Sequence, residues 1–272
     1  MHVSGLFIYP VKSLQGYAVD ALEFDEVGPK HDRRFLVIDA TGRMLTQRVE
    51  PRMVAVNTAV SDTTLTLSAS GAGSIAVSTR SDPTAPLRTV TVWKSDGLQV
   101  EDCGDAAAAW LSNVLGQPCR LVRAGEAFRR VVTKKAAVAG DIVSFADAVP
   151  ALVIAEASLH DLNDRLVAMG EDAVPMNRFR PNIVIAGAAP YAEDTWPRIR
   201  MGDVTFRAAG PCSRCIMVTT DQLTGLRAKE PLRTLATYRR DQADPTDVNF
   251  GQNLIHETKT GVVRVGDAVV AG

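Results

Sequence analysis

The stretch TTLTLS, residues 63–68, alternates polar and apolar side chains and gives the clearest indication of the fold. A period of two places the apolar side chains on one face of a strand, so we predict a half-buried strand here. Short apolar or alternating runs of the same kind recur at residues 3–9, 35–39, 75–79 and 89–93. Turn residues separate these runs. The first hundred residues therefore indicate an antiparallel sheet or barrel.

Helical patterns begin only after residue 104. An alanine-rich segment, residues 105–115, predicts a helix that stops at Gly116. Residues 158–169 place three leucines and a methionine on one face, with Ser158 and Asp161 at capping-box spacing. A third helix is predicted from Pro231. Further strands are predicted at residues 151–155, 182–186, 204–208, 216–220 and 261–265. The pattern indicates a β-rich α+β fold with a few helices, and the gap near residues 120–150 is the expected boundary between two β-rich units.

Composition excludes several functional classes. The chain has 272 residues, of which 46% are hydrophobic, so it can bury a sizeable core in one large domain or two packed ones. Thirty basic and 31 acidic residues give a net charge of −1, which offers no overall attraction to nucleic acid or to anionic membranes. No apolar run is long enough to span a membrane, and the N-terminus lacks the pattern of a signal peptide. We expect a cytoplasmic monomer.

The pair Cys212 and Cys215, in the segment GPCSRC, is the most informative short motif. A zinc site would need two more ligands, and the other cysteines and histidines form no second spaced pair. A thioredoxin-type redox pair should open a helix, whereas the residues that follow predict a strand. Two buried structural cysteines are the commonest outcome for any CxxC. The fourth alternative is a single thiolate that binds a soft metal, which Arg214 would favour by stabilising the anion.

Three basic turns lie beside predicted strands. Lys12 and Ser13 follow the first strand, Arg33 and Arg34 precede the second, and the segment RFRPN, residues 178–182, precedes another. Guanidinium groups recognise phosphate in a planar, bidentate manner, and a lysine with a serine adds a point charge and a hydroxyl. Taken singly, each turn could be a solvated surface. Together they favour a ligand that carries phosphate.

Several segments, in this order along the chain, resemble the MOSC family, in the branch of the bacterial YcbX-like proteins and the mitochondrial amidoxime-reducing components. They are YPVKS (9–13), DRRFLVID (32–39), FADAVPALVIAEASLHDLN (145–163), RFRPNIVIAG (178–187), YAEDTW (191–196), CSRCI (212–216), KEPL (229–232) and VGDAV (265–269). The pair RFRPN and CSRC is specific, whereas YPVKS or VGD alone would be weak.

The resemblance implies two packed domains and a cofactor. Residues 1–122 would form a MOSC N-terminal β-barrel-like domain and residues 123–272 a MOSC β-barrel domain, with the molybdenum cofactor between them. Cys215 matches the cysteine that binds molybdenum in the family and is therefore also the expected catalytic residue. The residues that match or adjoin positions holding the pterin and its phosphate are Lys12, Ser13, Arg33, Ser158, Arg178, Arg180, Asn182, Ser213 and Arg214. Cys212 is expected to be a neighbour rather than a ligand.

The resemblance also implies a reaction. Relatives reduce small N-hydroxylated compounds, such as amidoximes, hydroxylamines and N-hydroxylated bases, to the N–H compound and water. No cysteine follows Cys215, so we expect no iron–sulfur cluster and predict a separate electron-donor protein, either a ferredoxin or a flavin reductase. Lys134, Lys135 and Lys229 lack an acidic partner for a pyridinium nitrogen, so we expect no pyridoxal phosphate. His31, His160 and Asp221 are candidate proton donors, although surface or turn roles are commoner for such residues.

Two hypotheses remain as alternatives to the first, which is an N-hydroxylated compound reductase. MOSC domains also resemble the C-terminal part of molybdenum cofactor sulfurases, so the chain could be a cofactor or sulfur carrier without reductase activity. A carrier would bind the cofactor and fail to reduce an N-hydroxylated compound. The third hypothesis is a structural β-rich domain that binds no cofactor, in which replacing Cys215 would change nothing.

Overall fold

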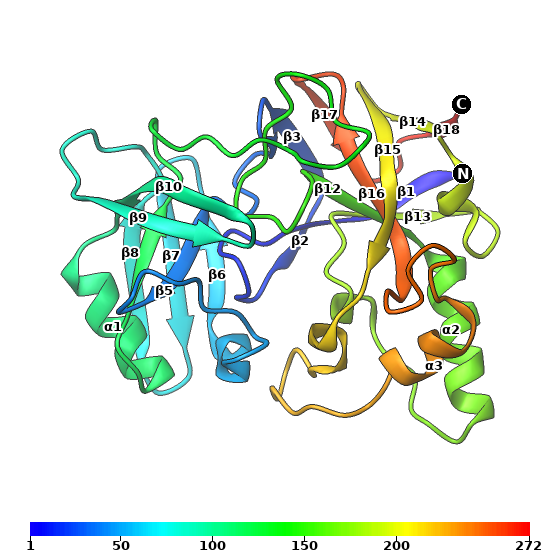
Figure 1. Ribbon diagram of the computed structural model, residues 1–272, viewed down its shortest axis with the longest axis horizontal. Helices are drawn as coiled ribbons and strands as arrows, with labels where there is room; N and C mark the ends of the chain where they lie inside the picture. Colours follow the sequence, from blue (N-terminus) through cyan, green and yellow to red (C-terminus); the bar gives the residue numbers. More distant parts are fainter.

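The computed structural model describes all 272 residues as 18 strands, three α-helices and four short 3-10 helices. Two halves lie side by side in Figure 1, one built mainly from residues 35–123 and the other from residues 151–271 with the first strands of the chain. This arrangement confirms the predicted β-rich α+β class. No helix is both long and apolar enough to cross a lipid bilayer.

The first half contains two sheets and one helix. One sheet has the order β5 (Phe35–Asp39), β11 (Cys119–Arg123), β10 (Ser95–Asp102), β9 (Leu87–Val92), and the other has the order β6 (Asn57–Val60), β7 (Thr64–Ala69), β8 (Gly73–Ser78). The strand predicted at residues 63–68 is β7, and its Leu65 and Leu67 are completely buried. They pack with Leu111 and Leu115 of α1 (Asp105–Leu115), which ends at Gly116 in a left-handed conformation.

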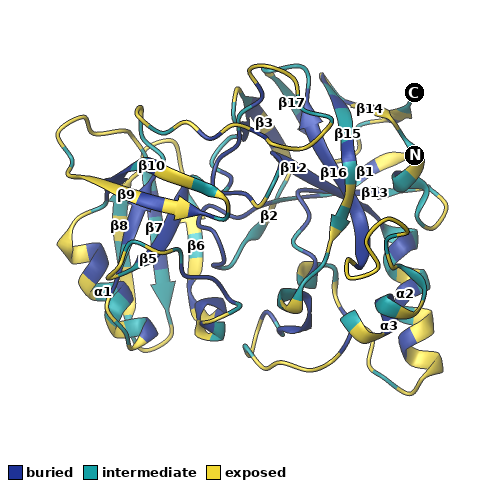
Figure 2. Cartoon of the chain, viewed as in Figure 1, coloured by how far each residue is buried: buried dark blue, intermediate teal, exposed yellow.

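The second half is organised around one large sheet. Its order is β18 (Val269–Ala271), β14 (Arg198–Met201), β15 (Val204–Ser213), β16 (Asn249–His256), β12 (Ala151–Ala155), β13 (Ile183–Ala186), β1 (His2–Ile8), β2 (Tyr17–Val19). A small sheet of β17 (Gly261–Arg264), β3 (Ala21–Asp25) and β4 (Gly28–Pro29) adjoins it. Strands β12 and β13 run parallel, and α2 (Glu156–Ala168) connects them as the crossover that parallel strands need. Figure 2 shows the central strands β12, β13 and β16 of this sheet largely buried.

The start of the chain belongs spatially to the second half. Strand β1 pairs antiparallel with β13, and β3 pairs with β17 near the C-terminus. Residues 2–29 therefore complete sheets whose other strands come from residues 151–271. The boundary that we predict at residues 122 and 123 stays a prediction, but pairing across it makes the two halves depend on each other.

Two local predictions were wrong. Residues 216–220 were expected as a strand, yet Ile216–Thr219 form the 3-10 helix η4. The Thr219 hydroxyl donates to the Ile216 carbonyl at 2.8 Å, so the β-branched side chain closes a turn. The capping box was also wrong, because α2 begins at Glu156 and the Ser158 side chain bonds elsewhere.

Candidate functional site

A cavity between the two halves gathers most of the predicted site residues. It encloses about 870 Å³ of free space, part of it open to solvent, and 23 residues line it. Nine of the ten predicted site residues are among them: Lys12, Ser13, Arg33, Arg178, Arg180, Asn182, Ser213, Arg214 and Cys215. These residues come from four chain segments as much as 203 positions apart (12 to 215). The fold therefore creates a single site from motifs that are separate in the sequence.

The cavity is strongly cationic although the whole chain is not. Its lining contains one lysine and five arginines, Lys12, Arg33, Arg48, Arg178, Arg180 and Arg214, and a single carboxylate, that of Asp147. The chain as a whole has a net charge of −1. Cations lining a concave surface raise the local concentration of anions. The cavity is therefore suited to an anionic ligand.

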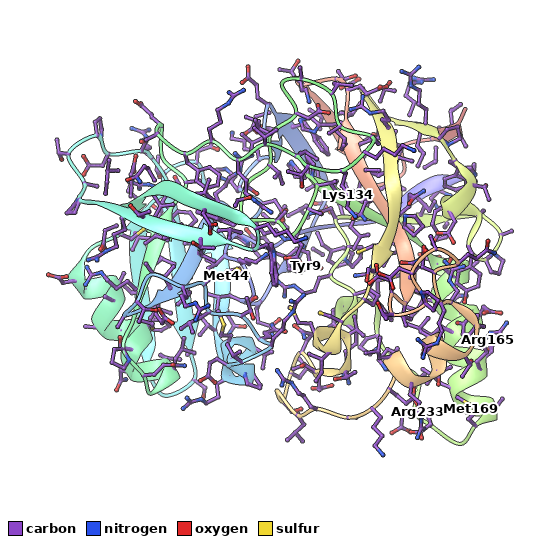
Figure 3. The ribbon with its side chains drawn as sticks, in the orientation of Figure 1. Tyr9, Met44, Lys134, Arg165, Met169 and Arg233 are labelled. Carbon is purple, nitrogen blue, oxygen red and sulfur yellow. The ribbon has the colours of Figure 1, made fainter.

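Arg33 and Arg180 lie over the same aromatic ring. The guanidinium carbon of each is 4.2 Å from the centroid of the Tyr9 ring, and Figure 3 places Tyr9 between the two halves. Burial raises the pKa of Tyr9 to about 12, so its ring stays neutral beneath the cations. Burial also lowers the pKa of Arg180 to about 10, so this side chain remains charged at neutral pH.

The two arginines differ in their hydrogen bonds. Arg33 donates to Asp32 at 2.6 Å, to the amide oxygen of Asn182 at 3.0 Å and to the Arg180 carbonyl at 3.1 Å. Asn182 is itself held by the Phe7 carbonyl, to which its amide nitrogen donates at 3.2 Å. The Arg180 side chain forms no hydrogen bond and no ion pair. Arg33 therefore stabilises the cavity wall, while Arg180 remains an unpaired cation in the cavity lining.

Lys12 and Asp147 form the only direct ion pair between lining residues. The Lys12 ammonium donates to the Phe145 carbonyl at 2.8 Å and to the Asp147 carboxylate. Burial lowers the pKa of Lys12. Burial raises the pKa of Asp147, but the Lys12 ammonium outweighs this effect and holds that pKa well below its ordinary range. Asp147 is thus a carboxylate at neutral pH and accepts hydrogen bonds rather than donating a proton.

Backbone strain is concentrated at the cavity. Six residues other than glycine have positive φ, and four of them line it: Ser13 at 67°, Arg33 at 47°, Trp93 at 56° and Arg180 at 53°. Side chains with a Cβ rarely adopt this conformation, and it persists only where surrounding contacts impose it. Strain of this kind is typical of functional sites.

The end of β15 positions the thiol of Cys215. The strand pairs with β16 as far as Ser213 opposite Asn249, and the chain then turns into η4 immediately after Cys215. Arg214 pins this turn, because its guanidinium donates to the Phe250 carbonyl at 2.7 Å and to the Phe179 carbonyl at 3.0 Å. Cys215 is half-buried at the cavity wall. Burial raises the pKa of the neighbouring Cys212 thiol, which disfavours its thiolate.

Trp93, Arg48 and Asp147 contact one another in the cavity lining, and the sequence assigned no role to any of them. Trp93 donates from its ring nitrogen to Asp147 at 3.2 Å, and the Arg48 guanidinium carbon lies 4.2 Å from the Trp93 ring centroid. Asp147 lies in the segment FADA, which carried the resemblance but received no role. Arg48 lies nine residues after the strand predicted at 35–39, so it did not qualify as a basic turn beside a strand. Nothing local in the sequence distinguishes Trp93.

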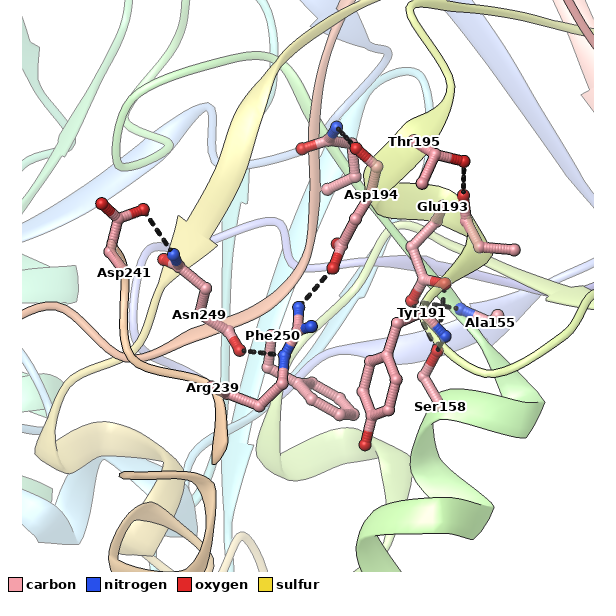
Figure 4. Close-up of polar contacts among 12 residues, drawn as sticks. Ala155, Ser158, Tyr191, Glu193, Asp194, Thr195, Arg239, Asp241, Asn249 and Phe250 are labelled. Atoms are coloured by element: carbon pink, nitrogen blue, oxygen red, sulfur yellow. Dashed lines mark hydrogen bonds and ion pairs between the residues drawn. The ribbon is translucent and has the colours of Figure 1, made fainter. Parts of the chain in front are cut away.

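Ser158 is the one predicted site residue outside the cavity. It is completely buried, and its hydroxyl lies 2.8 and 3.0 Å from the two carboxylate oxygens of Glu193. It also accepts a hydrogen bond from the Tyr191 backbone at 2.8 Å, as Figure 4 shows. Glu193 accepts a further bond from the Ala155 backbone at 3.1 Å. Ser158 therefore fixes the start of α2 against η3 (Ala192–Thr195) and does not face a ligand in the cavity.

The three candidate proton donors also lie outside the cavity lining. The His31 ring pairs with Asp62 at 3.2 Å near the surface, and His160 is exposed on α2. Asp221 accepts hydrogen bonds from the Leu223 and Thr224 backbones, so it begins a turn. None of the three is placed by the fold to donate a proton within the cavity.

Comparison with known proteins identifies the family. Residues 1–118 match the family model described as the MOSC N-terminal beta barrel domain, and residues 140–270 match the model described as the MOSC domain. The chain belongs to the MOSC family. Among its relatives, the mitochondrial amidoxime-reducing component 1 of Mus musculus is 40% identical over 98% of this chain and 81% of its own length. The human protein of the same name is 39% identical over 98% of this chain and 82% of its own length.

A second group of relatives consists of longer proteins. The molybdenum cofactor sulfurase of Oryza sativa subsp. japonica is 33% identical over 94% of this chain, but the match covers only 33% of that protein. The amidoxime-reducing relatives are described as mitochondrial, so the cytoplasmic location expected for this MOSC protein stays a prediction.

Proposed function

We propose that the cavity binds the molybdenum cofactor and that the protein reduces N-hydroxylated compounds with electrons from a separate donor protein. The observation that carries this proposal is the meeting of the Cys215 thiol and six cations in one cavity with a single carboxylate. The relatives named as amidoxime-reducing components supply the reaction class.

The lining residues fit such a cofactor chemically. Thiolate is a ligand that suits metals carried by sulfur-rich groups. Arg180 offers a cation without a hydrogen-bond or ion-pair partner, and Arg48, Arg178 and Arg214 each have a buried nitrogen with no hydrogen-bond acceptor. Buried donors are normally paired. A ligand with phosphate and pterin groups would supply the hydrogen-bond acceptors that these arginines lack.

Distinct roles follow for the residues of the chain. Cys215 would hold the metal, and Arg180, Lys12 and Ser13 would bind the phosphate or the pterin. When bound, this cofactor would supply two-electron chemistry that removes one oxygen atom from an N-hydroxylated compound, with two protons leaving in the water formed. Apolar side chains of the lining, such as Val149 and Leu152, would limit water around the reacting group. Asp147 stays ionised, so we infer that it orients a substrate N–H or O–H group by accepting a hydrogen bond.

The test begins with metal and pterin analysis of the purified protein, followed by reduction of benzamidoxime with reduced methyl viologen. Cys215→Ser should lower turnover per protein by more than about a hundredfold, because loss of a metal ligand exceeds the usual effect of outer contacts. Cys212→Ser is the matched control and should retain its metal. A Cys215→Ser protein with full molybdenum content and turnover would contradict the ligand assignment.

A cofactor carrier is the second candidate, favoured by the match to sulfurases. The two candidates differ in one measurement. A carrier would contain the cofactor and leave benzamidoxime unreduced when the artificial donor is present.

A further inference from the structure

The three most exposed large apolar side chains of the protein are Leu223, Leu226 and Val49, with exposed fractions of 84%, 72% and 71%. Leu223 and Leu226 belong to the loop between η4 and α3 (Leu232–Tyr238), much of which Figure 2 shows as exposed. Val49 lies just before the 3-10 helix η1 (Pro51–Ala55) of the other half. Isolated exposed apolar side chains are common, but a group of them marks an interaction site.

Direct contacts bring the two segments together. Arg227 donates to the carbonyl of Arg48 at 2.8 Å and to that of Gln47. The side-chain amides of Gln47 and Gln222 are both buried and exchange hydrogen bonds of 3.1 and 2.9 Å. Gly225 packs so closely that a Cβ there would lie 3.3 Å from the Pro51 carbonyl oxygen. Leu223, Leu226 and Val49 therefore lie on two segments that are in direct contact across the two halves, and we call these three exposed side chains the bridging face.

The bridging face adjoins the cavity. Arg48, next to Val49 in the chain, lines the cavity, and Arg178 of the lining bonds Asp221 at the start of the loop at 3.0 Å. Ile216 directly follows Cys215 and is 47% exposed. A protein bound on this face would thus lie beside the segment that carries the proposed metal ligand.

The charges around the bridging face are positive. Arg227 and Lys229 are exposed and have no carboxylate partner. The three acidic residues of the contributing segments are already paired, Glu50 with Arg52, Asp221 with Arg178 and Glu230 with Arg233. An apolar centre with a charged rim is the usual anatomy of a protein interface. Complementary charge speeds association and excludes wrong partners.

We propose that the bridging face is the docking surface for the electron-donor protein, and that the donor presents an acidic rim around an apolar centre. This inference rests on the proposed function. A second copy of this chain fits less well, because a two-fold interface would bring the same unpaired cations together. A small substrate would bind inside the cavity and not on the exposed loop that forms this face.

The test uses the holoenzyme with two electron sources, a reduced acidic [2Fe–2S] ferredoxin and reduced methyl viologen. The double variant Leu223→Glu/Leu226→Glu should raise the KM for ferredoxin about tenfold or more, because central interface residues carry most of the binding energy. Its rate with methyl viologen should stay unchanged. Lys229→Glu should raise the ferredoxin KM less and weaken its dependence on salt.

Val167→Glu on α2 and Arg264→Glu on β17 are matched controls, since both residues are exposed and lie outside the face. An unchanged ferredoxin KM in the double variant would overturn the docking proposal. Turnover of the wild-type protein with methyl viologen but not with an acidic ferredoxin would also overturn the docking proposal. So would a wild-type dimer in sedimentation that the double variant no longer forms, because the face would then bind a second copy of the chain. No turnover with either donor in a cofactor-loaded wild type would instead overturn the proposed function.

Discussion

Arg120 and Arg123 of the first half differ from Arg180 and Arg214 of the cavity in what neutralises their charge. In the first half, Arg123 lies 2.5 Å from Glu101, with both residues buried, and Arg120 bonds Asp102 at 2.6 Å. In the cavity, Arg214 bonds carbonyl oxygens and Arg180 has only an aromatic ring. Paired charges stabilise one folded arrangement, whereas an arginine without a carboxylate partner can still bind an anionic ligand. The difference separates structural arginines from those available for binding.

The largest effect should come from breaking a structural pair. Glu101→Gln leaves the buried Arg123 without its counter-charge, and the expected loss is about 3–5 kcal/mol in the free energy of unfolding. Urea unfolding measures it. The double variant Glu101→Leu/Arg123→Met should recover most of the loss, because it removes both charges. A single variant as stable as the wild type would show that the pair is not structural.

His256 extends the comparison to a buried base without a counter-charge. Burial, reinforced by Lys259, lowers the pKa of His256 to about 4, so the folded protein keeps the ring neutral. The unfolded chain binds a proton near pH 6.5, so stability should fall as the pH drops from about 6.5 to about 4, by about 3 kcal/mol in total. Urea midpoints across this range test it. His256→Gln should lose this dependence, and an equally steep loss in that variant would assign it to other groups.

Arg180→Met tests a cavity arginine that has no carboxylate partner. Removal of this cation should leave the urea midpoint unchanged or raise it, because no hydrogen-bond or ion-pair partner is left unsatisfied. Cofactor affinity should fall about tenfold to a hundredfold, since a hydrogen bond to a charged group contributes about 1.5–3 kcal/mol. Pterin content of the purified protein and its urea midpoint are the two measurements. A clear loss of stability with full pterin content would show that Arg180 stabilises the fold and does not bind the cofactor.

The smallest effect is expected at Ser158. Ser158→Ala removes a hydroxyl from the buried Glu193 carboxyl, and the expected loss is about 1–2 kcal/mol in unfolding free energy. Molybdenum and pterin content should not change, because Ser158 lies outside the cavity. A drop in cofactor content at full stability would restore the role that the resemblance suggested for this residue.

Local sequence patterns predicted most elements, with instructive failures. The alternating residues of β7 and the alanine-rich α1 followed their periodicity, because each pattern depends only on neighbours along the chain. Residues 216–219 failed because β-branched side chains also suit a tight turn when a hydroxyl bonds the backbone. The capping box at Ser158 failed because a buried carboxyl 35 residues away competes for the hydroxyl.

By itself, the sequence determined the strand and helix periodicities, the family motifs and the set of residues that could bind a metal or a phosphate. Only the tertiary structure decided which of them meet. Lys12 reaches Phe145 across 133 positions, and Gln47 reaches Gln222 across 175. Periodicity arises from local backbone geometry, whereas such meetings depend on long-range strand pairing and on the competition of every buried polar group for a partner. In that competition Arg180 obtained no hydrogen-bond or ion-pair partner, whereas Ser158 bonds Glu193 and lies outside the cavity.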